Sequence, residues 1–298
     1  MRSEKKYATF RVGNISGMRA AYRKLRLDFD AALQRAGLHS DDFDHPENMI
    51  PYPAIDTLYS IAAHEAGCSH FGLLVGAAPF NLGLPGFLAT HAPTVRIGLE
   101  CLVKSLNRID NVGNAELSER SGFGTLSYEL AVPNLRSKDQ MYDTAIATAA
   151  NLLRRLLGDG FIPQQVRLPF KRPADDSLHR DFYARWNVRF VAHDAAIVFE
   201  ASWLDRAIKG ADAELFKYLL HVLESDPIGD ITTMADQIRR VLPGLVRRGK
   251  VKRNRIAGMF GLHPRTMARR LAEENVSLQS LVEEARFEVA SRLLMDTS

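Results

Sequence analysis

Apolar residues recur at helical spacing through the first part of the chain, up to about residue 106. Five apolar side chains, three or four residues apart and followed by Gly37, predict one helix with a buried face: Met18, Tyr22, Leu25, Phe29 and Leu33. A second amphipathic helix is predicted between Pro53 and Gly67. Glycine and proline are frequent from residue 71 to 93, which favours short helices and turns, and helical spacing returns over 95–106.

The pattern then changes from helical spacing to alternation. Segments 115–119 and 123–132 alternate around Ser121 and Gly122, which predicts a β-hairpin. A helix with one apolar face is predicted over 141–157, ending at Gly158. Apolar segments at 165–170, 188–191 and 196–200 are typical of strands, and 215–223 is again helical. Residues 16–224 therefore predict a mixed α/β domain.

The chain after residue 230 has only helical spacing. Residues 225–230 are rich in Asp, Pro and Gly and are the strongest candidate linker. We expect an all-α domain over 231–298, with Asp230 capping its first helix, so the fold class of the whole chain is α+β. Residues 1–15 are charged and contain no apolar segment, which predicts a flexible basic tail.

Charge separates the two predicted domains. Residues 228–298 hold 13 Lys and Arg against 8 Asp and Glu, although the whole chain carries a net charge of only +4. Eleven cations and no acid lie between Arg239 and Arg270. Such a field favours a polyanion as partner. The alternative is a solvated cationic face that acids from elsewhere in the fold balance.

Residues 253–271 have the spacing of a helix-turn-helix. Ala257 is small enough for the second helix to pack on the first, and Gly261 tolerates the positive φ of a sharp turn. Pro264 suits the first position of the second helix. Five apolar residues fall where the helix pair needs a core: Ile256, Phe260, Leu262, Met267 and Leu271.

The second helix, about Pro264–Glu274, has a face suited to reading DNA. With Met267 and Leu271 turned inward, three side chains share the opposite face and are candidates for base contacts: Arg265, Ala268 and Arg269. Four further side chains are candidates for phosphate contacts: Thr266, Arg270, Lys252 and Arg253. A plain helical hairpin with solvated arginines explains the apolar spacing equally well, but it does not explain the lack of acids.

Residues 262–279, LHPRTMARRLAEENVSLQ, resemble the first helix-turn-helix of AraC/XylS transcription regulators, and 281–294 resemble the linker helix that follows it. The resemblance implies that Arg265, Ala268 and Arg269 stand where the family reads bases. His263 stands where serine is commoner at the cap, and Arg270 occupies a position that is often apolar in other helix-turn-helix families.

The same resemblance implies a second helix-turn-helix beyond the linker helix, whereas this sequence ends at Ser298. We therefore expect a truncated chain that carries only the first half of the DNA-binding domain. Four apolar side chains of the linker helix are expected to pack on the first helix-turn-helix or on a neighbouring chain: Leu281, Ala285, Val289 and Leu293.

Residues from about 16 to 223 resemble, more loosely, the arabinose-binding-like effector domain of the ornithine- and arginine-responsive branch of that family. The segments that carry the resemblance are 71–76, 82–88, 93–95, 166–169, 198–200 and 203–205. The resemblance implies a domain that binds a small effector and mediates dimerisation, rather than a sugar-binding β-barrel. It does not identify arabinose as the ligand, and the ligand-binding residues stay unknown.

Motifs of catalysis are missing. The chain has no phosphate-binding loop, no dinucleotide-binding glycine turn and no hydrolase nucleophile elbow, so we expect neither an enzyme nor a cofactor. His64, Cys68 and His70 are the best metal candidate, but Gly67 interrupts their helix and a fourth ligand is missing, so no metal is expected. Five aromatic residues could line an apolar pocket or fill the core: Trp186, Trp203, Phe199, Phe123 and Tyr128.

These observations predict a ligand-responsive bacterial transcription regulator. With no signal peptide, no long apolar stretch and only two cysteines, we expect a cytoplasmic protein that does not engage membranes. The expected partners are duplex DNA, a small-molecule effector, a second copy of the chain and RNA polymerase. The alternatives are a small-molecule-binding protein or enzyme with a basic helical appendage, and an adaptor that binds protein through its C-terminal helices.

Overall fold

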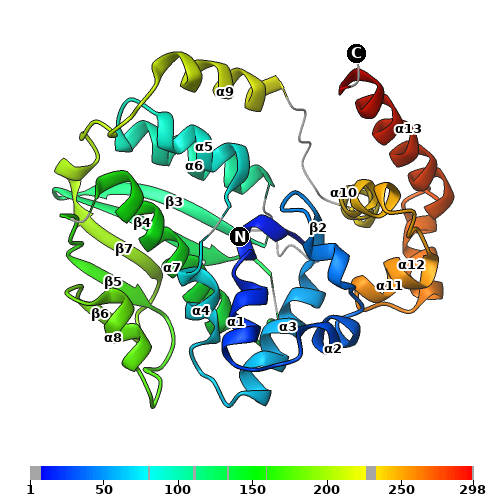
Figure 1. Ribbon diagram of the computed structural model, residues 1–298, viewed down its shortest axis with the longest axis horizontal. Helices are drawn as coiled ribbons and strands as arrows, with labels where there is room; N and C mark the ends of the chain where they lie inside the picture. The colour runs from blue at the N-terminus through cyan, green and yellow to red at the C-terminus, as the bar shows by residue number, and fades with distance from the viewer. Residues whose placement is uncertain are drawn as a thin grey trace.

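The computed structural model describes residues 8–79, 81–109, 112–132, 134–158, 160–225 and 233–296. In these ranges a five-stranded sheet with helices against it is followed by a helical C-terminal part, as Figure 1 shows, so the predicted α+β class is confirmed. The strands are β1 (Thr9–Arg11), β2 (Met49–Pro51), β3 (Gly113–Arg120), β4 (Phe123–Leu130), β5 (Gln165–Leu168), β6 (Val188–Phe190) and β7 (Ala195–Glu200).

The α-helices before residue 226 are α1 (Met18–Lys24), α2 (Phe29–Arg35), α3 (Tyr52–Glu65), α4 (Phe71–Ala77), α5 (Gly83–His91), α6 (Val95–Ile109), α7 (Lys138–Leu157), α8 (Ser177–Tyr183) and α9 (Ala213–Ser225). Those after it are α10 (Met234–Arg247), α11 (Arg253–Met259), α12 (Pro264–Glu273) and α13 (Leu278–Asp296). Short 3₁₀ turns cover Val12–Ile15, Ser40–Phe43 and Ala201–Trp203.

The main sheet has the strand order β3-β4-β7-β5-β6, with β5 and β6 parallel and the other pairs antiparallel. The predicted hairpin forms β3 and β4, with Arg120 opposite Phe123. Both residues between them have positive φ, 51° at Ser121 and 78° at Gly122. Two such residues in a two-residue loop match the twist of the flanking strands, which explains why this hairpin could be predicted from sequence.

Helix α7 packs on β4, β5 and β7, and α4 lies on α7. A Cβ at Gly72 would lie 2.0 Å from the carbonyl oxygen of Gln140, and one at Gly76 would lie 2.4 Å from that of Thr144. Only glycine at these two positions lets the helices approach so closely. Helix α6 packs on β3 and on α5.

The single helix predicted from Met18 to Leu33 is wrong, because the segment forms two helices. Arg26, between α1 and α2, has a φ of 56°, which an α-helix cannot contain. The side chain of Asp28 accepts a hydrogen bond from the backbone N–H of Ala31 at 3.0 Å and begins α2. The cap gives the backbone a local alternative to continuing the first helix.

The prediction of a flexible tail is also wrong for residues 8–15, which are buried or nearly so, while 1–7 lie outside the described residues. β1 pairs with β2, a partner about forty residues further along the chain. Arg11 is 4 % exposed, and it donates to Glu47, at 2.8 Å from Nε, and to the carbonyl oxygen of Asn81, at 2.6 Å. A charge that looked solvated in the sequence is thus neutralised inside the fold.

The C-terminal part is helical as predicted, but its first helix begins later. Thr233 caps α10 in a capping box with Asp236. Asp230, the predicted cap, and most of the predicted linker at 225–230 lie outside the described residues.

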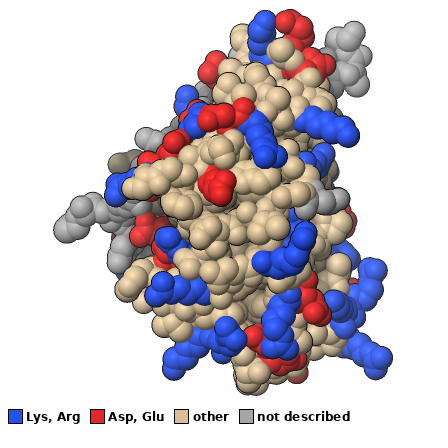
Figure 2. All heavy atoms as spheres, turned by 90° about the vertical axis from the view of Figure 1, so that its left-hand side faces the viewer, with Lys and Arg blue, Asp and Glu red and all other residues tan. Residues whose placement is uncertain are grey.

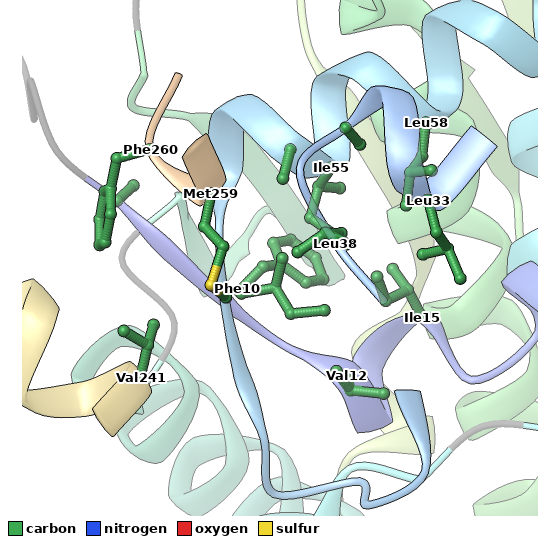
Figure 3. Close-up of a cluster of buried hydrophobic side chains, with 14 of the residues drawn as sticks. Phe10, Val12, Ile15, Leu33, Leu38, Ile55, Leu58, Val241, Met259 and Phe260 are labelled. Atoms are coloured by element: carbon green, nitrogen blue, oxygen red, sulfur yellow. The ribbon is translucent and has the colours of Figure 1, made fainter. Parts of the chain in front are cut away.

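The helices after residue 233 share a hydrophobic core with the first quarter of the chain. One buried cluster joins Phe10, Leu38 and Ile55 to Val241 and Met259, and Figure 3 shows these side chains together. A second cluster fills the space between the sheet, α5, α6 and α7. Helix α10 packs on β2, so the C-terminal helices sit directly on the β1–β2 pair.

Candidate functional site

Helices α11 and α12 form the predicted helix-turn-helix. The turn between them contains Gly261 with a φ of 62°, the conformation for which glycine was expected there. Ala257 is fully buried at the contact between the helices. Of the five predicted core residues, four are buried and Leu262 is partly buried. The local pattern was sufficient here because both helices and their turn lie within about twenty residues.

Helix α12 is capped by the residue that departs from the family pattern. The backbone N–H of Arg265 donates to Nδ1 of His263 at 3.2 Å, and Pro264 occupies the first turn. The imidazole therefore takes the role that a serine hydroxyl has at other helix N-termini. The helix ends at Glu273, one residue before the predicted end.

The three predicted base readers lie together on the outer face of α12. Arg265, Ala268 and Arg269 are exposed, while Met267 and Leu271 on the opposite face are buried. Thr266 and Arg270 flank this face and are half-buried. Nε of Arg269 lies 3.7 Å from Glu273, but both side chains are well exposed and such a surface pair contributes little.

Lys252 and Arg253, predicted to contact phosphates, lie at the start of α11. Both side chains are exposed. Neither forms an ion pair with any residue that the structure describes, so their charges are available to a partner.

Three other cations of the basic segment are neutralised by two acids from the turn Ser40–Phe43. Asp42 is 1 % exposed and accepts from Arg248 at 3.0 Å and from Arg255 at 2.7 Å. Lys250 lies 2.5 Å from Asp41. We call these five residues the acidic clamp. The basic stretch is therefore not a uniform cationic face, because part of its charge holds the C-terminal helices to the N-terminal part.

The acidic clamp lowers the pKa of Asp41. Burial opposes ionisation of Asp41, but the hydrogen bond from Lys250 and the charges of Arg248 and Arg255 outweigh it and lower the pKa of this carboxyl.

The backbone of the helix-turn-helix also lies close to the N-terminal part next to the clamp. A Cβ on Gly37 would lie 2.8 Å from the backbone of Gly258 in α11. Backbone contact and ion pairs thus dock the helix-turn-helix. The sequence offered no signal for this contact, since some two hundred residues separate the partners.

Glu274, just after α12, ties the helix-turn-helix to α10. Its carboxylate accepts from the backbone N–H groups of Met234 and Ala235, both at 2.9 Å. These groups belong to the first turn of α10, where a negative charge also faces the positive end of the helix dipole.

We expect Glu274→Gln to lower the free energy of unfolding by about 1–2 kcal/mol, because a neutral amide keeps one acceptor and loses the charge. The measurement is urea denaturation followed by circular dichroism. Glu273→Gln, one residue earlier and exposed, is the matched control and should change stability by less than about 0.5 kcal/mol. An equal effect of both substitutions would refute the role of Glu274.

Helix α13 only partly follows the prediction for a linker helix. Leu281, Ala285 and Val289 are buried, and α13 packs on α10, the helix before the helix-turn-helix. Leu293 was expected on the same face but is 57 % exposed. It lies one turn beyond Val289, the last buried residue of this face, and does not belong to the cluster shared with the N-terminal part.

A cavity of about 110 Å³ lies between α6, α7 and the β3–β4 hairpin. Of the five aromatic residues considered as pocket lining, only Tyr128 borders this cavity. Phe199 is fully buried and stacks edge-on against Phe161, as Trp186 and Trp203 do. Phe123 is 38 % exposed at the hairpin turn. Three of the five therefore pack around Phe161 rather than lining a pocket.

The proposed metal candidates do not meet. His64 is exposed at the end of α3, whereas Cys68 is buried. In the part of the chain that the structure describes, no group of three or more His, Cys, Asp or Glu residues is arranged to hold a metal ion. Nor is any helix of that part long and apolar enough to cross a membrane.

The face of the molecule on the side of the main sheet carries charges of both signs. Figure 2 views the molecule from there, the left of Figure 1, while α10–α13 lie at the right of Figure 1. Lysines, arginines and acids lie on this face around a central area where most atoms belong to uncharged residues.

Comparisons with known proteins agree with this geometry. The chain is 26% identical over 293 residues to the HTH-type transcriptional regulator VirS of Mycobacterium tuberculosis, covering 95% of this chain and 84% of that protein. The crystal structure of the transcriptional regulator CdpR from Pseudomonas aeruginosa superposes with a TM-score of 0.51 over 93% of this chain and 84% of that one. At 16% identity, this likeness shows a shared fold.

The model of one protein family matches residues 27–208, well over half of the chain. It describes the N-terminal arabinose-binding domain of AraC transcription regulators. Together with the helix-turn-helix of α11 and α12, this match shows that the chain belongs to the AraC family of transcription regulators.

Proposed function

We propose that the chain binds duplex DNA by inserting α12 into the major groove, and that a small effector bound in the N-terminal part changes this binding. The observation that carries the proposal is the outer face of α12. There Arg265, Ala268 and Arg269 are exposed together on a helix that Met267 and Leu271 anchor from behind. A helix held in this way presents its side chains to a groove without exposing its core.

The residue types on this face match base recognition. A guanidinium binds the O6 and N7 atoms of guanine through two hydrogen bonds, and the methyl group of alanine contacts a thymine methyl. We propose that four further side chains bind phosphates and set the register of the protein on the duplex. They are Thr266 and Arg270 at the sides of this face and Lys252 and Arg253 at the start of α11.

The shared hydrophobic core supports the proposed response to an effector. Helix α10 packs on β2, and buried residues of α10 and α11 belong to the same hydrophobic cluster as residues of β1, α2 and α3. A change of shape in the N-terminal part therefore reaches the helix-turn-helix through packed side chains. An effector has this result only if it binds the two arrangements with different affinity.

Helix α12 by itself reads only a few base pairs, and we propose that two copies of the chain bring two such helices to one regulatory site. Two recognition helices related by a two-fold axis fit DNA half-sites about 34 Å apart, which is one turn of B-DNA. The resemblance to the family also implies RNA polymerase as a partner at the promoter.

The salt dependence of DNA binding tests the proposal. Each phosphate contact contributes about −0.9 to the slope of log affinity against log salt. Arg253→Gln should therefore make the slope shallower by about 0.9, because Arg253 is exposed and not paired with any described acid. Fluorescence anisotropy of a labelled duplex between 50 and 200 mM salt, about the range in which such contacts weaken, gives the slope.

Lys250→Gln is the matched control, because Asp41 already neutralises this cation. We expect its slope to equal that of the unmodified chain. A flat slope for the unmodified chain would refute DNA binding through the basic segment. An equal change for Lys250→Gln and Arg253→Gln would refute the distinction between clamp cations and free cations.

A further inference from the structure

The cavity between α6, α7 and the β3–β4 hairpin has a mostly apolar wall. None of the described residues that line it carries a charged side chain. Its apolar wall is contributed by four elements: Leu102, Val103 and Leu106 of α6, Ile146, Ala149 and Leu152 of α7, Leu126 of β4, and Phe10 of β1. A mostly apolar wall without charges favours apolar guests.

The hydroxyl groups at one end of the cavity are already used within the protein. Tyr59 and Thr144 share a hydrogen bond of 2.8 Å. Oγ1 of Thr144 also lies 2.9 Å from the carbonyl oxygen of Gly72 and 3.0 Å from that of Gln140. The other polar side chains of the wall are neutral: Asn14, Ser127, Tyr128 and Thr148. A ligand therefore meets a few neutral polar groups and no charge from the described lining residues.

The cavity wall is unsuited to sugars and to free amino acids. These are the two ligand classes suggested by the name of the arabinose-binding domain and by the resemblance to the ornithine- and arginine-responsive branch. A sugar carries a hydroxyl on nearly every carbon and would leave most of them without a partner here. A free amino acid would bring an ammonium and a carboxylate group into a space without a counter-charge on any described lining residue. Burying unpaired polar or charged groups opposes binding strongly.

We propose that this cavity binds a small uncharged molecule with an aromatic or branched aliphatic body. In size it is comparable to an engineered cavity of about 150 Å³ that takes up benzene, so one ring or a short branched chain fills it. The binding itself follows from the cavity alone. Calling the molecule an effector rests on the function proposed above.

Phe10 connects the cavity to the DNA-binding helices. Its side chain borders the cavity and also belongs to the buried cluster that contains Met259 and Phe260 of the helix-turn-helix (Figure 3). Its strand, β1, pairs with β2, on which α10 packs. A ligand that moves Phe10 therefore acts on the surface that supports α10 and α11.

Calorimetric titration of the full chain tests the ligand class, with toluene and indole as probes and with L-arabinose and L-arginine for comparison. Both apolar probes should bind saturably, and in a separate thermal denaturation they should raise the melting temperature of the chain. The sugar and the amino acid should do neither. Ala149→Leu, which fills the cavity, should weaken the apolar probes at least tenfold. Ala115→Leu fills it from the opposite wall and should do the same if the first variant does not fold.

Two variants serve as controls. Ala63→Leu adds the same atoms at a partly exposed position of α3 that does not border the cavity, and it should leave probe affinity within twofold. Thr148→Val keeps the shape and removes a hydroxyl, so affinity for the apolar probes should stay the same or rise. Binding of arabinose or arginine that Ala149→Leu abolishes would overturn the proposal, as would probe binding that both filling variants leave unchanged.

The link to DNA has its own readout. Phe10→Leu changes the cavity wall as well as the link, so its DNA response is measured at probe concentrations that saturate this variant. There the change in DNA affinity that the probe causes should be smaller than in the unmodified chain. A chain that binds the probes but no DNA would confirm the ligand class and refute the proposed function. A full response to the probe in Phe10→Leu would overturn the role of Phe10.

Discussion

Asp42→Ala is expected to lower the free energy of unfolding by about 3–5 kcal/mol, the range measured when one partner of a buried ion pair is removed. The carboxylate is 1 % exposed and accepts from both Arg248 and Arg255. Its loss leaves two largely buried guanidinium groups with half of their counter-charge. Urea denaturation at pH 7 followed by circular dichroism measures the effect.

Asp44→Ala is the matched control, two residues further along the same turn. Its side chain is mostly exposed and lies 3.7 Å from Arg19, so its removal should change stability by less than about 0.5 kcal/mol. If Asp42→Ala were as mild as Asp44→Ala, the acidic clamp would not hold the C-terminal helices.

The comparison is made at neutral pH because the pKa of Asp41 is lowered in the folded protein. A carboxyl whose pKa is lower in the folded than in the unfolded protein adds stability above its unfolded value of about 3.9. That contribution disappears as the pH falls through the folded pKa. The contribution of Asp41 is therefore complete at pH 7 and is lost as the pH falls.

Arg265→Ala and Arg269→Ala are each expected to cost about 1–3 kcal/mol in binding to a specific DNA site, and the double variant should lose both contributions. Each side chain points outward from α12, so its removal leaves the core formed by Met267 and Leu271 intact. Each variant should also accept other bases at one position of the site. Selection of sites from random duplexes, followed by anisotropy titrations, measures both effects.

Arg270→Ala provides the contrast on the same helix. Its side chain is half-buried beside the reading face, and we expect its loss to weaken binding to all sequences alike. If all three single variants lowered affinity equally on random DNA, the assignment of the reading face would be wrong. Unchanged affinity in Arg265→Ala and Arg269→Ala would instead favour a protein-binding role for these helices.

The helix-turn-helix could be predicted from the sequence because its determinants are local. Ala257, Gly261 and Pro264 act through the backbone within a few residues, and the face with Arg265 and Arg269 follows from the helical repeat. The β3–β4 hairpin was predictable for the same reason, since its two-residue loop contains the positive-φ positions that the turn requires.

Errors arose where a local pattern had more than one solution. The helical spacing from Met18 to Leu33 fits one helix and also fits two helices with one common core, and the cap at Asp28 selects the second. Residues 8–15 have too little apolar periodicity to indicate a strand. They form β1 only because β2, far along the chain, offers unpaired backbone groups.

By itself, the amino-acid sequence determined the fold class, the helix-turn-helix and the residues on the outer face of α12, because hydrophobic periodicity, caps and turns act over short distances along the chain. Only the tertiary structure decided which cations of the basic segment are free and which hold the acidic clamp, and which residues surround the cavity. Those outcomes depend on contacts such as Asp42 with Arg255, 213 residues apart. Charge counts and spacing contain no information about such pairs, since the packing of the whole core brings them together.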